Sequence, residues 1–152
     1  MAELRLTILM PVRDDWAAAT ELIRRLDQAL AGIPCSAEVL AVDDLSATAW
    51  NPAPSGIGER IQRVQVLRLR RNLGHQRAIA IGLAYIEQHI PCDAVLVMDA
   101  DGEDTPEGAA QLLQEFLKAG GTQTIFAARS RRSENLTFQL GYRLFKVAHL
   151  LL

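Results

Sequence analysis

The sequence predicts an α/β fold in which a mostly parallel sheet carries helices on both faces. Strand-like and helix-like patterns alternate along the chain, and neighbouring parallel strands need helical crossovers between them. The 152 residues correspond to one domain, and 49% hydrophobic residues suffice for a buried core. Two of the strand-like runs end in paired carboxylates, at the edge where open α/β sheets bind ligands.

Five short apolar runs predict the strands of this sheet. Each is rich in branched side chains and is bounded by proline, glycine or polar residues. The runs span residues 4–10, 39–42, 64–69, 94–98 and 124–127. Pro11 closes the first run, and a loop rich in proline and glycine at 51–56 separates the second from the third.

Helical spacing of apolar residues predicts a helix after the first strand and another after the third. The first begins near Asp14 or Asp15 and ends at Gly32. The second covers about 75–89. Its predicted inner face consists of apolar residues at helical spacing, Ile79, Leu83 and Ile86.

The clearest helix start lies after the fourth strand. Thr105 supplies a capping hydroxyl, Pro106 fits the first turn, and Glu107 suits the positive end of the helix dipole. This helix is predicted to run to Lys118. A last amphipathic helix is predicted over 133–152, which divides the chain into a main domain, 1–132, and this C-terminal helix.

Composition argues against several classes of protein. The 16 basic residues nearly balance the 18 acidic ones, and a net charge of −2 predicts no general attraction for nucleic acid. Fourteen of the basic residues are arginines, whose guanidinium forks onto phosphate and carboxylate oxygens. Cys35 and Cys92 lack the spacing of zinc ligands or of a disulfide framework. We expect neither a signal peptide nor a membrane-spanning helix, since no uncharged apolar run approaches about 18 residues.

An acidic segment, residues 99–104, directly follows the fourth strand. In an extended chain Asp99 and Asp101 project to the same side, and Glu103 joins them if the chain stays open. Clustered carboxylates repel one another unless a hard divalent cation takes up their charge. A metal site is therefore one interpretation, and a solvated acidic turn before the helix at Thr105 is the other.

Four other motif classes fit this segment poorly or are missing from the chain. A calcium-binding EF-hand loop needs glycine at its sixth position and glutamate at its twelfth, where this chain has Asp104 and Ala110. A phosphatase of the haloacid-dehalogenase type carries a similar motif on its first strand, whereas here it follows the fourth. No P-loop and no GxSxG nucleophile elbow occurs in the sequence.

Four motifs, in order and spacing, give the chain a resemblance to a known family. They are MPVRDD at 10–15, VDDLS at 42–46, RRNLGHQRAIAIGL at 70–83 and VMDADGEDTPE at 97–107. Together they resemble the inverting family 2 glycosyltransferases with the GT-A fold. The branch most similar contains dolichol-phosphate mannose synthase and bacterial polyprenyl-phosphate sugar transferases, and it extends the likeness to 129–134 and 138–145.

This resemblance implies a nucleotide-sugar-binding domain over 1–132 and assigns residues to it. Pro11, Val12 and Asp14 would line the nucleotide pocket. Asp43 would contact the base or ribose, and Asp44 would support that loop. The family loop usually reads Asp-Asp-Gly-Ser-x-Asp, so Leu45 in place of the glycine leaves the course of this loop open.

The resemblance also assigns a metal site and a catalytic set. Asp99, Asp101 and Glu103 align with the family positions that bind Mg²⁺ or Mn²⁺ and the diphosphate. Asp101 would act in catalysis together with Arg129 and Arg131, which would approach the diphosphate or the acceptor phosphate. The metal would neutralise the diphosphate leaving group, and the arginines would add to that stabilisation.

The implied reaction moves a sugar, with inversion, from a nucleotide-diphosphate sugar to a polyprenyl phosphate. Relatives in this branch continue into an acceptor-side region that this sequence lacks. A non-catalytic nucleotide-binding or interaction module of the same fold is therefore the alternative. The apolar segment 144–152 suits a peripheral membrane contact, a dimer contact or packing on the domain's own sheet. We expect a cytoplasmic protein, at the cytoplasmic face of the membrane if the acceptor is a lipid.

Overall fold

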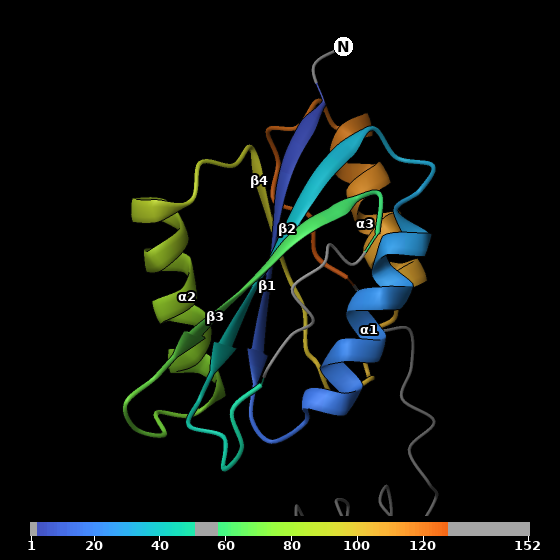
Figure 1. Cartoon of the computed structure of the whole chain (residues 1–152). Coiled ribbons are helices and arrows are strands. Elements are labelled where there is room, and N and C mark those ends of the chain that lie inside the picture. The colour runs from blue at the N-terminus through green and yellow to red at the C-terminus, as the bar shows by residue number, and fades with distance from the viewer. Residues whose placement is uncertain (1–2, 51–57, 128–152) are drawn as a thin grey trace, which may run out of the picture.

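The computed structural model describes residues 3–50 and 58–127, and within them four strands form one sheet in which every pair runs parallel. The order is β3-β2-β1-β4. The strands are β1 (Leu4–Val12), β2 (Cys35–Asp43), β3 (Ile61–Arg68) and β4 (Ala94–Val97). The helices are α1 (Trp16–Ala29), α2 (His75–His89) and α3 (Pro106–Lys118). Helices α1 and α3 cover one face and α2 the other, which confirms the predicted α/β class (Figure 1).

The larger part of the core lies between the sheet and helices α1 and α3. Alternate residues of β1, including Ile8 and Met10, point to this side because side chains alternate across a strand. They pack with buried residues of both helices, among them Ile23, Leu26 and Leu113. Leu9 points to the opposite face and packs with α2.

Helix α2 has the predicted bounds, and two of the three residues predicted for its inner face do face the core: Ile86 is buried and Ile79 is partly buried. The third, Leu83, is 41% exposed, and the other buried residues of the helix are Ala78 and Gly82. The reason is close approach: a Cβ on Gly82 would collide with the side chain of Leu9. A small residue at the contact lets the helix backbone come nearer to the sheet than the larger apolar residues would allow.

The first strand continues through Pro11 instead of ending at Met10, which corrects the predicted boundary. Pro11 lies in register opposite Val42 of β2. In a parallel strand the N–H and C=O of one residue point to the same side, and the Leu9 carbonyl accepts from Met98 on the β4 side. The nitrogen of Pro11 therefore points beyond the end of β4, where no ladder hydrogen bond is lost.

The predicted fifth strand is not formed, because residues 124–127 make no strand pairing in the structure. This run lines a cavity of about 650 Å³ together with Val95 and Val97 of the edge strand β4. Phe126, its largest side chain, is 85% exposed, so burial does not hold the run against the sheet. The predicted C-terminal helix, 133–152, lies outside the described residues.

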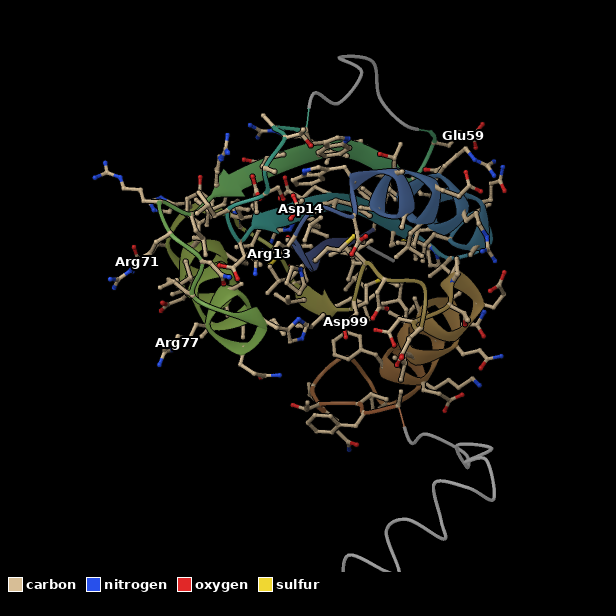
Figure 2. All side chains as sticks on the ribbon, turned by 90° about the horizontal axis from the view of Figure 1, so that it is seen from below. Arg13, Asp14, Glu59, Arg71, Arg77 and Asp99 are labelled. Carbon is tan, nitrogen blue, oxygen red and sulfur yellow. The ribbon has the colours of Figure 1, made fainter. Side chains whose placement is uncertain are left out.

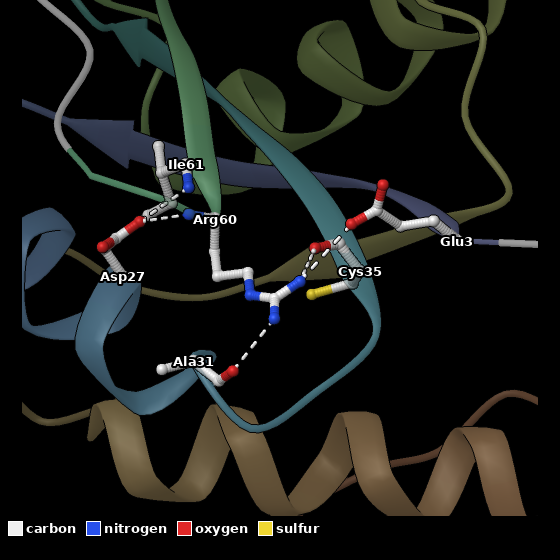
Figure 3. Close-up of polar contacts among 6 residues, drawn as sticks. All are labelled: Glu3, Asp27, Ala31, Cys35, Arg60 and Ile61. Atoms are coloured by element: carbon white, nitrogen blue, oxygen red, sulfur yellow. Dashed lines mark hydrogen bonds and ion pairs between the residues drawn. The ribbon is translucent and has the colours of Figure 1, made fainter.

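The amino-terminal edge of the sheet is tied together by one ion-rich cluster (Figure 3). Asp27 of α1 accepts hydrogen bonds from the backbone N–H groups of Arg60, at 2.8 Å, and Ile61, at 2.7 Å. The Arg60 guanidinium donates to the carbonyls of Ala31, at 3.0 Å, and Cys35, at 3.3 Å. These contacts fix the start of β3 against α1 and β2, at the end of the sheet opposite the acidic segments.

Candidate functional site

Three carboxyl-terminal strand ends bring their acidic residues to one edge of the sheet. Because β1 lies between β2 and β4, residues 11–15 lie between Asp43 and Asp44 on one side and Asp99 on the other. Figure 2 looks at this edge and shows Arg13 and Asp14 near its centre, with Asp99 beside them. Parallel topology thus assembles a site from segments that are far apart in the sequence.

Asp43 organises the loop that follows β2. Its carboxylate is 1% exposed, accepts from the Ser46 backbone N–H at 2.7 Å and lies 3.4 Å from the Arg68 Nε. Arg68 also donates to the Ser46 carbonyl at 3.0 Å. Leu45 adopts a φ of 64°, a left-handed conformation that favours glycine. The loop therefore keeps a glycine-type turn although leucine occupies the position.

Asp44 joins the end of β2 to the start of α2. Its two carboxylate oxygens accept from the backbone N–H groups of Leu73, at 2.7 Å, and Gly74, at 2.9 Å. Asp44 is buried and holds amides that precede the helix, and its carboxylate is occupied by this structural role. The structure thus gives Asp44 the role of a support for the loop that precedes α2.

Asp14 contacts this same loop and does not line the cavity described below. Its N–H donates to the Ser46 hydroxyl at 2.9 Å, and its carboxylate accepts from the Ala47 N–H at 2.7 Å. Trp16 contacts the loop further along by stacking on Trp50, with ring centroids 5.2 Å apart. The segments after β1 and β2 are therefore one hydrogen-bonded unit.

A cavity of about 190 Å³ opens between the end of β1, the segment after β4 and the first residue of α2. It carries charges of both signs. Its lining residues are Pro11, Val12, Arg13, Asp15, His75, Asp99, Ala100 and Asp101. Four of the predicted site residues therefore lie together in this cavity, namely Pro11, Val12, Asp99 and Asp101.

Asp99 occupies an environment that disfavours its charged form. Partial burial raises the pKa of its carboxyl, and the carboxylates of Asp104, Asp101 and Glu103 raise that pKa further. His75 opposes them, with its Nε2 3.3 Å from the Asp99 Oδ1. A cation in this cavity would lower the electrostatic energy of the ionised carboxylate.

The segment after Asp99 turns, and Glu103 lines a cavity other than the one that Asp99 and Asp101 share. Asp101 accepts from the Glu103 N–H at 2.9 Å, and Gly102 has a φ of 90°. Glu103 lines the separate cavity beside β4 and the start of α3. Within residues 3–50 and 58–127, no three His, Cys, Asp or Glu side chains are grouped so as to hold a metal ion.

Asp99 and Asp101 still fit a cation that shares its coordination with a ligand. Mg²⁺ is commonly bound by one or two carboxylates together with substrate phosphates and water. Both carboxylates line the same cavity, and burial with like charge makes the ionised state of Asp99 costly without a cation. The donor set therefore suits a cation that arrives with phosphate oxygens, and it does not form a complete protein cage.

Sequence reasoning did not assign Arg13, Asp15, His75 or Asp104 to the site. Arg13 and Asp15 lie inside the first motif and line the cavity, so the motif itself carried the signal. Asp104 accepts from the Asp99 N–H at 2.8 Å and fixes the turn. The position of Asp104 depends on the fold of the turn, which spacing alone does not give. Arg129 and Arg131 lie outside the described residues.

The family model and the relatives that match this chain agree on one family. The family model described as glycosyl transferase family 2 matches residues 7–150. An uncharacterized glycosyltransferase of Bacillus subtilis, YkcC, is 26% identical over 88% of this chain and 39% of its own. The undecaprenyl-phosphate 4-deoxy-4-formamido-L-arabinose transferase of Erwinia tasmaniensis is 29% identical over 86% of this chain and 39% of its own.

A solved structure gives the same fold. The crystal structure of residues 1–349 of S. aureus TarS superposes with a TM-score of 0.53 at 15% identity, and the match covers 87% of this chain and 39% of that chain. The chain spans about two fifths of the length of the curated relatives described above. Among its described residues, none of the helices combines the length and the hydrophobicity needed to cross a bilayer.

Proposed function

The chain belongs to glycosyl transferase family 2, and from that premise we propose that it transfers a sugar from a nucleotide-diphosphate sugar to a lipid phosphate. The cavity at the carboxyl edge of the sheet would hold the diphosphate of the donor. The observation that carries this proposal is that Asp99, Asp101 and Arg13 line one cavity. Carboxylates suit a divalent cation, and a guanidinium suits a phosphate oxygen.

Each lining group has a separate task in this proposal. Asp99 and Asp101 would hold Mg²⁺ or Mn²⁺ against the diphosphate. Arg13 would donate to a diphosphate oxygen on the β1 side of the cavity. Asp43 would receive the nucleoside on the side of the β2 loop, where its position is fixed by Ser46. When bound, the divalent ion neutralises the charge that develops on the leaving diphosphate.

The proposed chemistry is a single displacement. An oxygen of the lipid phosphate attacks the anomeric carbon from the side opposite the diphosphate. The new carbon–oxygen bond forms as the bond between the anomeric carbon and the diphosphate breaks, and the electron pair of the broken bond leaves with the diphosphate. Because the attack comes from the opposite side, the configuration of the anomeric carbon is inverted. The attacking oxygen is already anionic near neutral pH, so this step needs no general base. Arg129 and Arg131 would balance the negative charge of the two phosphate groups.

A lipid phosphate is favoured as the acceptor by the names of the relatives. Several of them, including that of Erwinia tasmaniensis, are undecaprenyl-phosphate transferases. We therefore propose that the protein acts at the cytoplasmic face of a membrane. The second candidate function is nucleotide binding without transfer, which the same cavity would serve.

Calorimetric titration with nucleoside diphosphates, with and without Mn²⁺, tests the donor site. We expect binding that needs the metal and that Asp99→Asn and Asp101→Asn each weaken by roughly tenfold or more. Glu115→Gln is the control, because it also replaces an exposed acid by an amide but lies on the far end of α3, paired with Lys118 at 2.6 Å. If no nucleoside diphosphate binds in a metal-dependent manner, the proposed function is wrong.

Transfer is tested separately from binding. Incubation of the 152-residue chain with a donor that binds and a short polyprenyl phosphate should yield the glycosylated lipid and a free nucleoside diphosphate. Metal-dependent binding with no product would favour the binding module over the transferase.

A further inference from the structure

One interval of the sequence carries a strongly one-sided charge. No Asp or Glu occurs between Glu59 and Glu87, and this interval contains six arginines. Because the whole chain has a net charge of −2, the basic charge of this interval is a local feature. It includes the loop from β3 to α2 and the first turns of α2.

Three of these arginines form an exposed group that we call the basic corner: Arg70 and Arg71 in the loop, and Arg77 in α2. None of their three guanidinium groups makes a hydrogen bond or ion pair with any residue in the described part of the chain. Figure 2 shows Arg71 and Arg77 on the same side of the molecule, both pointing away from its body. The basic corner therefore presents charge that residues 3–50 and 58–127 do not neutralise.

Seven other arginines lie in the described residues, and two of them, Arg13 and Arg63, also have no described carboxylate within ion-pair distance. The other five lie within 3.4 Å of a carboxylate oxygen, namely Arg5, Arg24, Arg25, Arg60 and Arg68. The basic corner differs from these five because no carboxylate of the described residues lies within ion-pair distance of its guanidinium groups. A guanidinium left free in this way can fork onto phosphate oxygens from outside the protein.

The basic corner is joined firmly to the cavity. The N–H groups of Leu73 and Gly74, within the same loop, are held by Asp44 at 2.7 and 2.9 Å. His75, the first residue of α2, lines the cavity and lies 3.3 Å from Asp99. A surface bound at the basic corner would therefore fix the position and orientation of the cavity as well.

We propose that the basic corner docks the protein on a bilayer containing anionic phospholipids. The inference rests on the proposed function, because an acceptor carried by a lipid requires the cavity to lie at a membrane. Phosphodiester headgroups supply the missing anions, and the surface potential of an anionic leaflet attracts basic groups near it. A bilayer is favoured over nucleic acid because the proposed acceptor is itself a lipid, and a net charge of −2 predicts no general attraction for nucleic acid.

Vesicle flotation with the full 152-residue chain tests the docking surface, without nucleotide or metal. The two preparations are phosphatidylcholine alone and an equimolar mixture with phosphatidylglycerol. We expect binding to the mixed vesicles only, reduced by salt. The triple variant Arg70→Gln, Arg71→Gln, Arg77→Gln should lower the partition coefficient by roughly a hundredfold, since each arginine near an anionic surface contributes about a fivefold factor.

The matched control removes the same charge elsewhere, by Arg24→Gln, Arg25→Gln and Arg63→Gln, all exposed and away from the loop. It should bind mixed vesicles nearly as well as the parent chain. Equal losses in the two variants, or no loss at the basic corner, would overturn the inference. So would an oligonucleotide that binds at equal phosphate concentration as tightly as the vesicles do and loses its binding in the same triple variant.

Calorimetry on the same variants separates this inference from the proposed function. The basic-corner variant should keep the parent's affinity for nucleoside diphosphate and metal, with an unchanged circular dichroism spectrum. Nucleotide binding without vesicle binding rejects the docking surface alone. Vesicle binding without nucleotide binding rejects the proposed function alone.

Discussion

Asp99 is under opposing influences at the level of the single residue. Burial and three nearby carboxylates disfavour its ionised form, while His75 favours it. The backbone N–H of Asp99 is held by Asp104 at 2.8 Å, which fixes the backbone of the turn at this position. A carboxylate kept in such surroundings costs stability and gains affinity for a cation.

We predict that Asp99→Asn stabilises the folded protein at neutral pH. A raised pKa means that ionised Asp99 penalises the folded state at pH values above that pKa. The penalty disappears as the pH falls below the ordinary value of 3.8. Because the Asp99 side chain is 38% exposed, we expect a gain of less than about 1 kcal/mol at pH 7. Thermal denaturation of both proteins between neutral and acidic pH measures it, and a difference that grows toward acid would contradict the prediction.

At the level of elements, the sequence predicted an element correctly where neighbouring residues alone determine it, as a capping residue does at the start of a helix. Helix α3 begins as predicted, with the Thr105 hydroxyl accepting from the Gly108 N–H at 3.1 Å. The burial of Gly82 and the exposure of Leu83 in α2 could not be predicted in the same way, because they depend on how closely the helix approaches β1. The sequence likewise predicted that β1 ends before Pro11. The strand continues through Pro11 because the nitrogen of this residue lies beyond the end of β4, where no hydrogen bond is lost.

Gly82→Ala tests the close approach of α2 to the sheet. Alanine is normally the better helix former, by about 1 kcal/mol. At this position, however, its Cβ would collide with the Leu9 Cδ1 and lie 2.9 Å from the Val42 Cγ2. We expect a net loss of about 1 to 3 kcal/mol in the free energy of unfolding, measured by urea denaturation.

Gly32→Ala is the control for this substitution, since a Cβ there meets no atom within 4 Å. It should leave the free energy of unfolding nearly unchanged. A stabilised Gly82→Ala protein would show that the sheet and helix can separate at no cost, and the packing explanation would then be wrong.

At the level of the whole molecule, the site depends on the order of the strands. The sequence predicted that acidic segments meet at one edge of a parallel sheet, and the family resemblance carried by its four motifs is confirmed. Neither the pattern of acidic residues nor the family resemblance predicted the turn that places Glu103 at another cavity. That turn depends on the local conformation of Asp101 and Gly102, in which Asp101 accepts from the Glu103 N–H. The cavity is thus a product of topology first and of loop geometry second.

Because the site is built from the ends of separate strands, occupation of the cavity should stabilise the whole domain. The segments after β1 and β4 contribute Arg13 and Asp99, and a bound diphosphate with its metal would join them. At a free ligand concentration about a hundred times the Kd, linkage predicts roughly 2.7 kcal/mol of added stability. For a domain of this length that corresponds to an increase in Tm of about 5 to 10 °C.

Asp99→Asn should start from a higher Tm at pH 7 and show little further increase with nucleoside diphosphate and Mn²⁺. Differential scanning calorimetry distinguishes the two effects, because a variant that is merely damaged would have a lower starting Tm. An equal ligand-induced increase in the parent chain and the variant would mean that the ligand binds away from this cavity.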